Sequence, residues 1–338
     1  ISIMEDRFGH RISYLRVSIT DRCNERCQYC MPDEMQEWLP RGGILSYEEI
    51  ERVVRVGVGL GIRKLRVTGG EPLTRRDVLG FMRRLCGIDG VDDVGISTNG
   101  TLLARSASDH GAETVAHHLV DSGVRSANIS LDTLDRAAYR ETTGRDYLPR
   151  VIEGIDAALA AGMPSVKINS VLMNGRNDSG LLDMVEFART RGLLLRFIEL
   201  MPVSRTDVIT EENFLSAGRA RKMIEAELGE LKPRPDFKTN GPSSYFEVPG
   251  SGQLIGFIGA MTNFHFCESC NKLRLTCDGK LRPCLGSHLE FDMLEQLRGG
   301  ASDADLERFF KDVVERKPEA HDFRDNYQPK RRMIAIGG

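Results

Sequence analysis

Two groups of closely spaced cysteines are the side chains of this chain best suited to chemistry. Three of the eight cysteines lie within eight residues near the start and four within eighteen near the end, namely Cys23, Cys27, Cys30, Cys267, Cys270, Cys277 and Cys284. The chain has no apolar run of about 20 residues and begins without an apolar leader, so we expect a cytoplasmic protein with no membrane span. In a reducing compartment, such clusters favour metal binding over disulfides.

The first set has the spacing C-x3-C-x2-C and directly follows a strand-like run. Three thiolates fall one short of the four that hold a complete [4Fe–4S] cluster, which leaves one iron open for an exchangeable ligand. Zinc in a structural site takes four ligands, and His10 is the only nearby candidate for the fourth. The spacing therefore favours an iron–sulfur cluster with one open iron.

The second set begins with the C-x2-C pair Cys267 and Cys270, and Cys277 and Cys284 follow. Four thiolates that include a pair at this spacing fit a structural zinc site. A second iron–sulfur cluster is the rival interpretation. The spacing alone leaves both open.

The elements that position these sets are repeated strand–helix units. Strand-like runs lie at 14–19, 64–68, 94–98, 127–131, 166–171 and 194–199. Helical patterns follow them, the first beginning after Ser46 with a capping box to Glu49 and the others at about 77–86, 111–122, 149–161, 179–190 and 211–228. Six such units predict an α/β fold with a parallel sheet and right-handed crossovers. They are two units short of a closed eight-stranded barrel, so we expect an open, partial barrel.

Polar residues recur with period two in strands that should be apolar if both faces were buried. They are Arg16, Ser18, Thr20, Arg66, Thr68, Ser97, Asn99, Asn128, Ser130, Asp132, Lys167 and Asn169. Each set lies on one face of its strand, which predicts a polar barrel interior that holds a ligand. Internal ion pairs to a carboxylate such as Glu71 would account for only one or two of the cations.

A change of composition near residue 229 predicts a second, C-terminal domain. We expect domains at 1–228 and 229–338, with a hairpin at 244–260 and helices at about 288–298 and 302–315. With 46 Lys and Arg against 49 Asp and Glu, the net charge is -3. This balance argues against a nucleic-acid-binding protein, although a local basic pocket is compatible with it.

The first cysteine set, together with a second motif, resembles radical S-adenosylmethionine enzymes. Tyr29 precedes the third cysteine, where that superfamily has an aromatic residue at the adenine, and Gly69, Gly70 and Glu71 open a G-G-E-P motif after the second strand. The resemblance implies an open six-unit barrel. It also implies that the open iron binds S-adenosylmethionine and that reductive cleavage yields a 5′-deoxyadenosyl radical.

Nearly the whole chain is similar to the GTP 3′,8-cyclases that begin molybdenum cofactor biosynthesis. The resemblance covers blocks such as LRVSITDRCNERCQYCMP, LRVTGGEPLTRRD, LRFIELMPV and the terminal Gly-Gly. It implies a second [4Fe–4S] cluster on Cys267, Cys270 and Cys284, in a C-terminal domain that caps the barrel. Cys277 is extra to that pattern, and a fourth ligand at this position would close the cluster.

Carried over position by position, the resemblance assigns candidate site residues. For S-adenosylmethionine they are Tyr29, Gly69, Gly70, Glu71, Ser130, Asn169 and Met201. For GTP they are Arg16, Arg66, Ser97, Thr98, Lys167, Lys272, Leu273 and Arg274. Arg16 and the Gly337–Gly338 tail are expected beside the reacting centre as catalytic residues.

The implied reaction begins with abstraction of hydrogen from C3′ of GTP, and the resulting carbon radical adds to C8 of guanine. The implied partners are an electron donor of the flavodoxin or ferredoxin type and a cyclic pyranopterin monophosphate synthase that takes the product. The oligomeric state is left open, and a homodimer is one possibility. The alternatives are a radical peptide-modifying maturase with an auxiliary cluster and a non-enzymatic zinc-binding interaction protein.

Overall fold

A single open sheet organises the molecule. The computed structural model describes residues 3–31, 37–107, 113–204, 208–325 and 327–337. Within them, the sheet has the order β12-β11-β10-β1-β2-β3-β4-β5-β6-β9-β8-β7. Its central strands are parallel and lie within one residue of the predicted runs: β1 (Tyr14–Ser18), β2 (Lys64–Thr68), β3 (Asp93–Thr98), β4 (Ser126–Ser130), β5 (Ser165–Leu172) and β6 (Leu194–Glu199).

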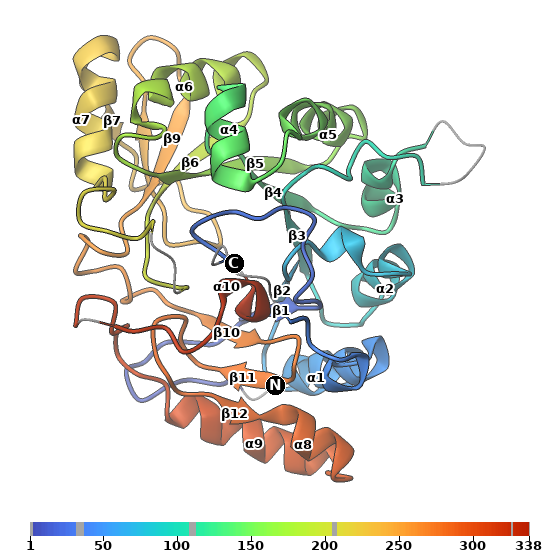
Figure 1. Cartoon of the computed structure of the whole chain (residues 1–338). Helices are drawn as coiled ribbons and strands as arrows, with labels where there is room; N and C mark the ends of the chain where they lie inside the picture. Colours follow the sequence, from blue (N-terminus) through green and yellow to red (C-terminus); the bar gives the residue numbers. More distant parts are fainter. Residues whose placement is uncertain (1–2, 32–36, 108–112, 205–207, 326, 338) are drawn as a thin grey trace.

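The helices between these strands lie along the outer side of the sheet (Figure 1). The predicted ones are α1 (Tyr47–Gly59), α2 (Val78–Cys86), α3 (Val115–Asp121), α5 (Leu148–Ala160), α6 (Leu181–Thr190) and α7 (Ala217–Leu228). The expected capping box forms at α1, where Ser46 Oγ accepts from the Glu49 backbone N–H at 3.1 Å. Helix α4 (Arg136–Thr143) was not predicted, because it buries only Tyr139, Thr142 and Thr143 and so lacks an apolar stripe.

Strands of the C-terminal segment extend the sheet on both sides. On one side β10 (Lys272–Leu275) pairs in parallel with β1 and is followed by β11 (Lys280–Arg282) and β12 (Phe291–Asp292). On the other side β9 (Leu254–Ile258) pairs in parallel with β6 and is followed by β8 (Ser244–Glu247) and β7 (Lys232–Pro233). The predicted hairpin forms as β8 and β9. The sequence did not predict that both ends of this segment join the barrel sheet.

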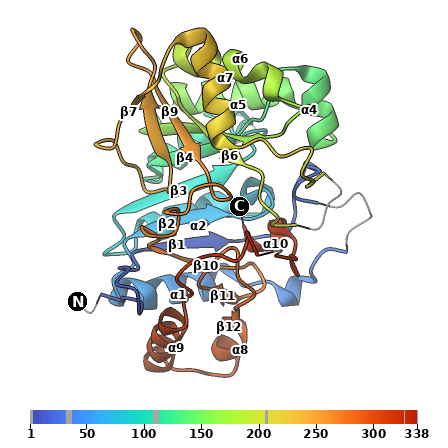
Figure 2. The same cartoon turned by 90° about the vertical axis from the view of Figure 1, so that its left-hand side faces the viewer.

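Three further helices complete the C-terminal segment, namely α8 (Met293–Arg298), α9 (Asp303–Glu315) and α10 (Met333–Ile336). Figure 2 shows α8 and α9 at one end of the molecule, beyond β12, and α7 with β7 at the other. Among the described residues, no helix is both long and apolar enough to cross a bilayer. The division into domains at residue 229 stays a prediction, because one sheet carries strands from both sides of it.

The two faces of β1 explain the unusual polarity of the strands. Leu15 and Val17 are fully buried in the main hydrophobic core beneath the outer helices. Arg16 points to the other face and lines a cavity. The alternation of side chains along a strand thus separates an apolar outer layer from a polar interior.

Candidate active site

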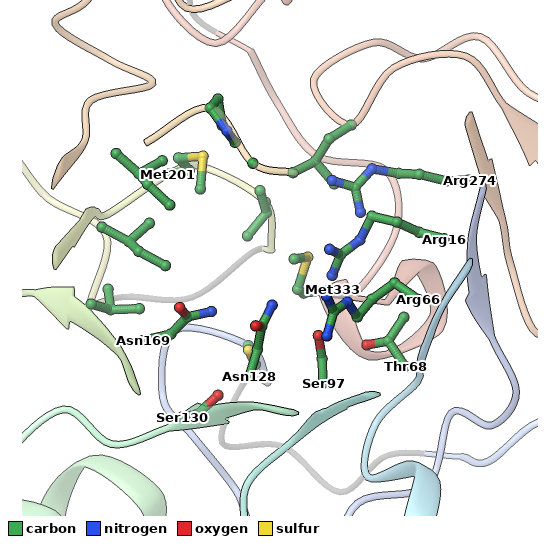
Figure 3. Close-up of a pocket in the computed structure, with 18 of the residues that line it drawn as sticks. Arg16, Arg66, Thr68, Ser97, Asn128, Ser130, Asn169, Met201, Arg274 and Met333 are labelled. Atoms are coloured by element: carbon green, nitrogen blue, oxygen red, sulfur yellow. The ribbon is translucent and has the colours of Figure 1, made fainter. Parts of the chain in front are cut away.

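The interior of the barrel contains a cavity of about 370 Å³ that both halves of the chain line. Cys23, Cys27 and Cys30 line one part of it, and Cys267, Cys270 and Cys284 line another. The cavity thus brings together two cysteine sets that lie more than two hundred residues apart in sequence. Side chains from the central strands, such as Arg16, Asn128 and Asn169, lie around the cavity (Figure 3).

The first cysteine set lies on the loop that leaves β1. Backbone hydrogen bonds from Arg26 and Gln28 to the carbonyls of Thr143 and Thr142, 2.8 and 3.0 Å, fix this loop to the end of α4. Burial is the main cause that raises the pKa of the Cys23 thiol to about 12. A bound metal is therefore needed to stabilise a thiolate here.

The glycine pair after β2 allows the cysteine loop to pack closely. A Cβ on Gly69 would lie 2.7 Å from the Thr20 carbonyl oxygen, and one on Gly70 would lie 2.3 Å from that of Arg22. The Gly70 N–H donates to the Thr20 carbonyl at 2.8 Å. Only glycine at these two positions leaves room for the backbone of the cysteine loop. This requirement adds to the predicted one, that glycine lets the backbone approach a ligand closely.

Acidic groups surround the first cysteine set. Glu25 and Asp132 line the cavity, and Asp132 accepts a hydrogen bond from the Tyr29 hydroxyl at 2.8 Å. Burial raises the pKa of Glu25 to about 7 and that of Asp132 to about 6. A buried carboxylate gains from a positive ligand, so this end suits a cation.

Glu71 lies behind this end, and its carboxylate accepts hydrogen bonds from within the protein. The donors are the backbone N–H groups of Leu73 and Asn99, at 3.0 and 2.7 Å, and the Thr98 hydroxyl at 2.8 Å. Hydrogen bonds from Leu73, Thr98 and Asn99 therefore satisfy this carboxylate, in place of the ion pair with a barrel arginine that was considered above. The side chain of Glu71 fixes the loop after β2 against the end of β3.

Three arginines lie side by side on one wall of the cavity (Figure 3). They come from neighbouring strands, and the register places Arg16 of β1 opposite Arg274 of β10 and Arg66 of β2. Like charges directly opposite each other destabilise a sheet. Burial, followed by the charge of Arg16, lowers the pKa of Arg274 to about 9. This arginine row favours an anion with several charges.

Three further cations line the same cavity, namely Lys167 of β5, Arg196 of β6 and Lys272 of β10. Burial, followed by the charges of Arg196 and Arg66, lowers the pKa of Lys167 to about 8. Arg196 donates to Oδ1 of Asn169 at 2.9 and 2.6 Å. Cations therefore line the cavity both from β10, β1 and β2 and from β5 and β6, farther along the sheet.

Two lysines, Lys272 and Lys317, lie close to the second cysteine set. Lys317, which is 2% exposed, donates to the backbone carbonyls of Pro283 and Lys272, and so it contacts residues next to or near Cys284 and Cys270. Although burial opposes the shift, the charges of Lys317 and Lys272 lower the pKa of Cys270. This set thus has a thiol that ionises more readily than those of the first set.

Cys277 is separate from both sets. It is fully buried, hydrogen-bonds Ser18, and its backbone N–H meets the Ala335 carbonyl at 3.4 Å. It does not line the cavity that Cys267, Cys270 and Cys284 share. The structure therefore gives no support to a fourth thiolate from this residue.

The C-terminal tail enters the barrel beside β1 and β2. The Gly337 carbonyl accepts a hydrogen bond from Nη1 of Arg274 at 2.9 Å. Gly337 has a φ of +86°, and a Cβ there would lie 2.5 Å from Thr68 Cγ2. Only glycine fits without a shift, and the tail thereby reaches the arginine row. Gly338, predicted to act with it, lies outside the described residues.

Most other predicted site residues line the cavity, namely Tyr29, Ser97, Thr98, Ser130, Asn169 and Met201. Leu273 differs, because its side chain is fully buried in the hydrophobic core, on the opposite face of β10 from Lys272 and Arg274. Oδ1 of Asn128 is buried in the cavity wall and has no hydrogen-bond partner among the described residues. This acceptor is available to a ligand.

Comparison with known proteins decides the family. The radical SAM superfamily matches residues 17–188, and the domain Molybdenum Cofactor Synthesis C matches residues 193–323. A GTP 3′,8-cyclase of Thermodesulfovibrio yellowstonii is 42% identical over 336 residues, which cover 99% of this chain and 100% of the relative. One from Paracoccus denitrificans is 44% identical over 324 residues, which cover 94% and 89%. The chain belongs to the GTP 3′,8-cyclase family.

Solved structures show the same fold at lower identity. Streptococcus suis SuiB has a TM-score of 0.60 and 15% identity, over 94% of this cyclase-family chain and 69% of that chain. SuiB bound to S-adenosylmethionine has a TM-score of 0.56 and 14% identity, over 92% and 76%. The predicted radical SAM fold is therefore confirmed, and the match to Molybdenum Cofactor Synthesis C supports a C-terminal domain of that kind.

Radical SAM enzymes carry a [4Fe–4S] cluster that acts with S-adenosylmethionine, and the residues of this cyclase-family chain fit both groups. The three thiols of the first set are in no disulfide. They share the cavity with Glu25 and Asp132, which suit the sulfonium and ammonium charges of the cofactor. Oδ1 of Asn128, which has no hydrogen-bond partner in the described part of the chain, adds an acceptor in the same cavity.

The arrangement of donors also bears on the zinc alternative. No three His, Cys, Asp or Glu side chains within the described part of the chain are placed to hold one metal ion. A tetrahedral zinc site requires its sulfurs about 2.3 Å from a common centre. An iron–sulfur cluster is several atoms wide and keeps its thiolates farther apart. The described residues thus contain no preformed site for a single zinc ion at either set.

Several residues in or next to the cavity were not predicted from the sequence: Tyr14, Glu25 and Arg196 line it, and Lys317 lies beside the second cysteine set. Arg196 had a usable signal, since it is a lone cation between apolar neighbours in β6 and faces the interior by the same alternation as Arg16. Lys317 gave no such signal in the sequence, because it follows α9 in a charged stretch and is buried only in the folded structure.

Proposed function

We propose that the chain converts GTP to 3′,8-cyclo-7,8-dihydro-GTP by a radical mechanism. One observation carries the proposal: a single cavity is acidic at the first cysteine set and cationic between there and the second. S-adenosylmethionine has a net positive charge near its sulfonium, and GTP carries about four negative charges. The two ligands would thus occupy the cavity together, each against groups of opposite charge.

At the acidic end, Cys23, Cys27 and Cys30 would hold a [4Fe–4S] cluster with three thiolates. When bound, the cluster and S-adenosylmethionine supply a 5′-deoxyadenosyl radical by one-electron cleavage. Tyr29 would contact the adenine, with its hydroxyl fixed by Asp132 at 2.8 Å. The backbone of Gly69 and Gly70, together with Ser130, Asn169 and Met201, would hold the rest of the cofactor.

At the cationic end, the arginine row Arg274–Arg16–Arg66 would bind the triphosphate, with Lys167, Arg196 and Lys272 completing the neutralisation. Guanidinium groups bind phosphate oxygens in bidentate geometry. Ser97 and Thr98 would add hydroxyl contacts. Cys267, Cys270 and Cys284 would hold a second [4Fe–4S] cluster and leave one iron for the guanine base.

The contribution of the protein is then positioning. Fixing the phosphates and the base at separate points leaves the ribose between them, exposed to the cofactor end. Hydrogen from C3′ leaves as part of 5′-deoxyadenosine, a C3′–C8 bond forms, and one electron and one proton complete the reduced ring. Gly337, held by Arg274, would close the cavity beside the arginine row.

The remaining partners follow from this chemistry. A flavodoxin- or ferredoxin-type protein would supply the electrons, and a cyclic pyranopterin monophosphate synthase would take the product. We further propose a cytoplasmic location, a barrel domain over 1–228, a capping domain over 229–338, and a homodimer as a candidate assembly. Each is an expectation from the sequence.

The proposal is tested by anaerobic reconstitution followed by incubation with dithionite, S-adenosylmethionine and GTP that carries deuterium at C3′. We expect about eight irons per chain, deuterium in 5′-deoxyadenosine, and the cyclised nucleotide by mass spectrometry. Cleavage of the cofactor with no transfer of deuterium would contradict GTP as the substrate.

A further inference from the structure

Tyr14 occupies a central place among the cations of the cavity. It lies on β1 two residues before Arg16, on the same face, and it is 3% exposed. The register places it opposite Lys272 of β10 and Lys64 of β2. Its phenol therefore lies in the row next to the arginine row and lines the same cavity.

The phenol contacts three of the cations assigned above to GTP. Its hydroxyl accepts a hydrogen bond from Nε of Arg66 at 3.1 Å and also hydrogen-bonds Arg16. Nζ of Lys272 lies 5.6 Å from the centre of its ring, within the range of a cation–π contact. One uncharged side chain thus links cations from three adjacent strands.

We propose that Tyr14 is a positioning residue that orients Arg16, Arg66 and Lys272 for the triphosphate; the inference rests on the proposed function. Arg66 is also fixed by hydrogen bonds to the Ile96 carbonyl at 3.1 Å and the Ser126 hydroxyl at 3.0 Å, so the phenol connects Arg16 and Lys272 to a guanidinium that is already in place. A phenol that holds them in place lowers the ordering cost when the anion binds.

The chemistry of a phenol suits this role better than that of a carboxylate. A carboxylate at this point would neutralise part of the charge that the ligand needs, whereas a neutral hydroxyl accepts hydrogen bonds and leaves that charge available. Burial raises the pKa of Tyr14, but the charges of Arg66, Arg16 and Lys272 outweigh it and lower the value to about 8. At pH 7 the hydroxyl is therefore still mostly protonated.

The test is the Tyr14→Phe variant, which removes the hydroxyl and keeps the ring beneath Lys272. GTP, GMP and guanosine are titrated anaerobically into the holoenzyme by calorimetry. We expect GTP to bind about tenfold more weakly, because hydrogen bonds to two charged groups are lost. Guanosine, which has no phosphate, should keep its affinity to within about twofold.

Tyr47→Phe is the matched control, because it removes a tyrosine hydroxyl whose hydrogen bond, to the Arg76 carbonyl at 2.9 Å, lies outside the cavity. It should leave all three affinities unchanged. The ratio of GTP to guanosine affinity decides the outcome, since partial misfolding of Tyr14→Phe would weaken both ligands alike. An unchanged ratio would overturn the inference. A wild-type holoenzyme that does not prefer GTP to guanosine would instead overturn the proposed function.

Discussion

The two ends of the cavity contain the same donors, three thiols each, yet their surroundings have opposite charge. Glu25 and Asp132 flank the first set, whereas Lys272 and Lys317 flank the second. Thiols alone therefore do not decide what each end binds. Under the proposed function, neighbouring charges that the strands arrange would direct a cationic cofactor to one end and an anionic substrate to the other.

Burial acts on both ends in the same way, by disfavouring the charged forms. It raises the pKa of Asp132 to about 6 at one end and lowers that of Lys167 to about 8 at the other. Each end is thus destabilised while it is empty and relieved by a ligand of opposite charge. Under the proposed function, one physical cause would thus make the two ends selective for ligands of opposite charge.

The largest expected effect comes from removing a thiol at either end. Cys27→Ser should abolish both cofactor cleavage and cyclisation, whereas Cys284→Ser should abolish cyclisation and leave cofactor cleavage intact. The reason is that, under the proposed function, the radical-forming group would be at the first end. Iron analysis and 5′-deoxyadenosine release measure the two activities separately. Full cyclase turnover in Cys284→Ser would contradict the assignment of the second set.

Arg16→Met should weaken the binding of GTP much more than that of S-adenosylmethionine. Loss of the central arginine of the row should weaken GTP binding about 100-fold and change the affinity for S-adenosylmethionine by less than about twofold. The nucleotide-free protein should become more stable by up to about 1 kcal/mol, because like charges on adjacent strands no longer repel. Calorimetry and chemical unfolding test both effects, and a loss of stability would refute the repulsion.

Gly337→Ala tests the tail that meets the arginine row. A Cβ there would lie 2.5 Å from Thr68 Cγ2, so the tail must move away from Arg274. We expect cyclase turnover to fall about tenfold or more, with the thermal midpoint changed little, because Gly337 itself belongs to neither hydrophobic cluster. Gly300→Ala, also at positive φ but distant on the turn after α8, is the control. Unchanged turnover in Gly337→Ala would argue against the tail as part of the site.

The cationic end should also respond to pH. Burial, followed by the charges of Arg196 and Arg66, lowers the pKa of Lys167 to about 8, so this lysine is charged below that value and neutral above it. Tyr14, with a pKa of about 8, becomes a phenolate in the same range. The first change removes a positive charge and the second adds a negative one, so GTP affinity should fall several-fold between pH 7 and 9. Titration calorimetry across that range is the measurement, and Lys167→Gln should show a flatter profile.

Asp132→Asn gives the smallest effect and tests the acidic end. The amide still accepts from the Val171 N–H, at 2.8 Å in the native protein, but carries no charge. The affinity for S-adenosylmethionine should fall about fivefold at pH 7.5 and that for GTP should not change. Equal losses for both ligands would show that the ends are not independent.

The sequence predicts the central fold well because the signals are local. Each of the six parallel strands has an apolar face that alternates with polar residues, and helix signals such as the Ser46 capping box mark the units between them. Helix α4 lacks an apolar stripe and escaped prediction. Strands β10 to β12 were not predicted because they are short. The pairing of β10 with β1 also joins segments near the two ends of the chain, which no local signal shows.

Site residues that belong to a sequence motif could be predicted. Residues that reach the site only through tertiary contacts were harder to predict. The cysteine sets and most of the cations line the cavity as expected. The side chain of Leu273 does not, since the alternation along β10 places it in the core. The acidic surroundings of the first set depend on Asp132, which meets Tyr29 across 103 residues. No local pattern encodes that contact.

The most direct test is an anaerobic crystal structure of the reconstituted protein with GTP and S-adenosylmethionine. We predict the triphosphate against Arg274, Arg16 and Arg66, and the sulfonium on the side of Glu25 and Asp132. A triphosphate bound outside the cavity, or a cofactor against the arginine row, would contradict the assignment of opposite ligands to the two ends.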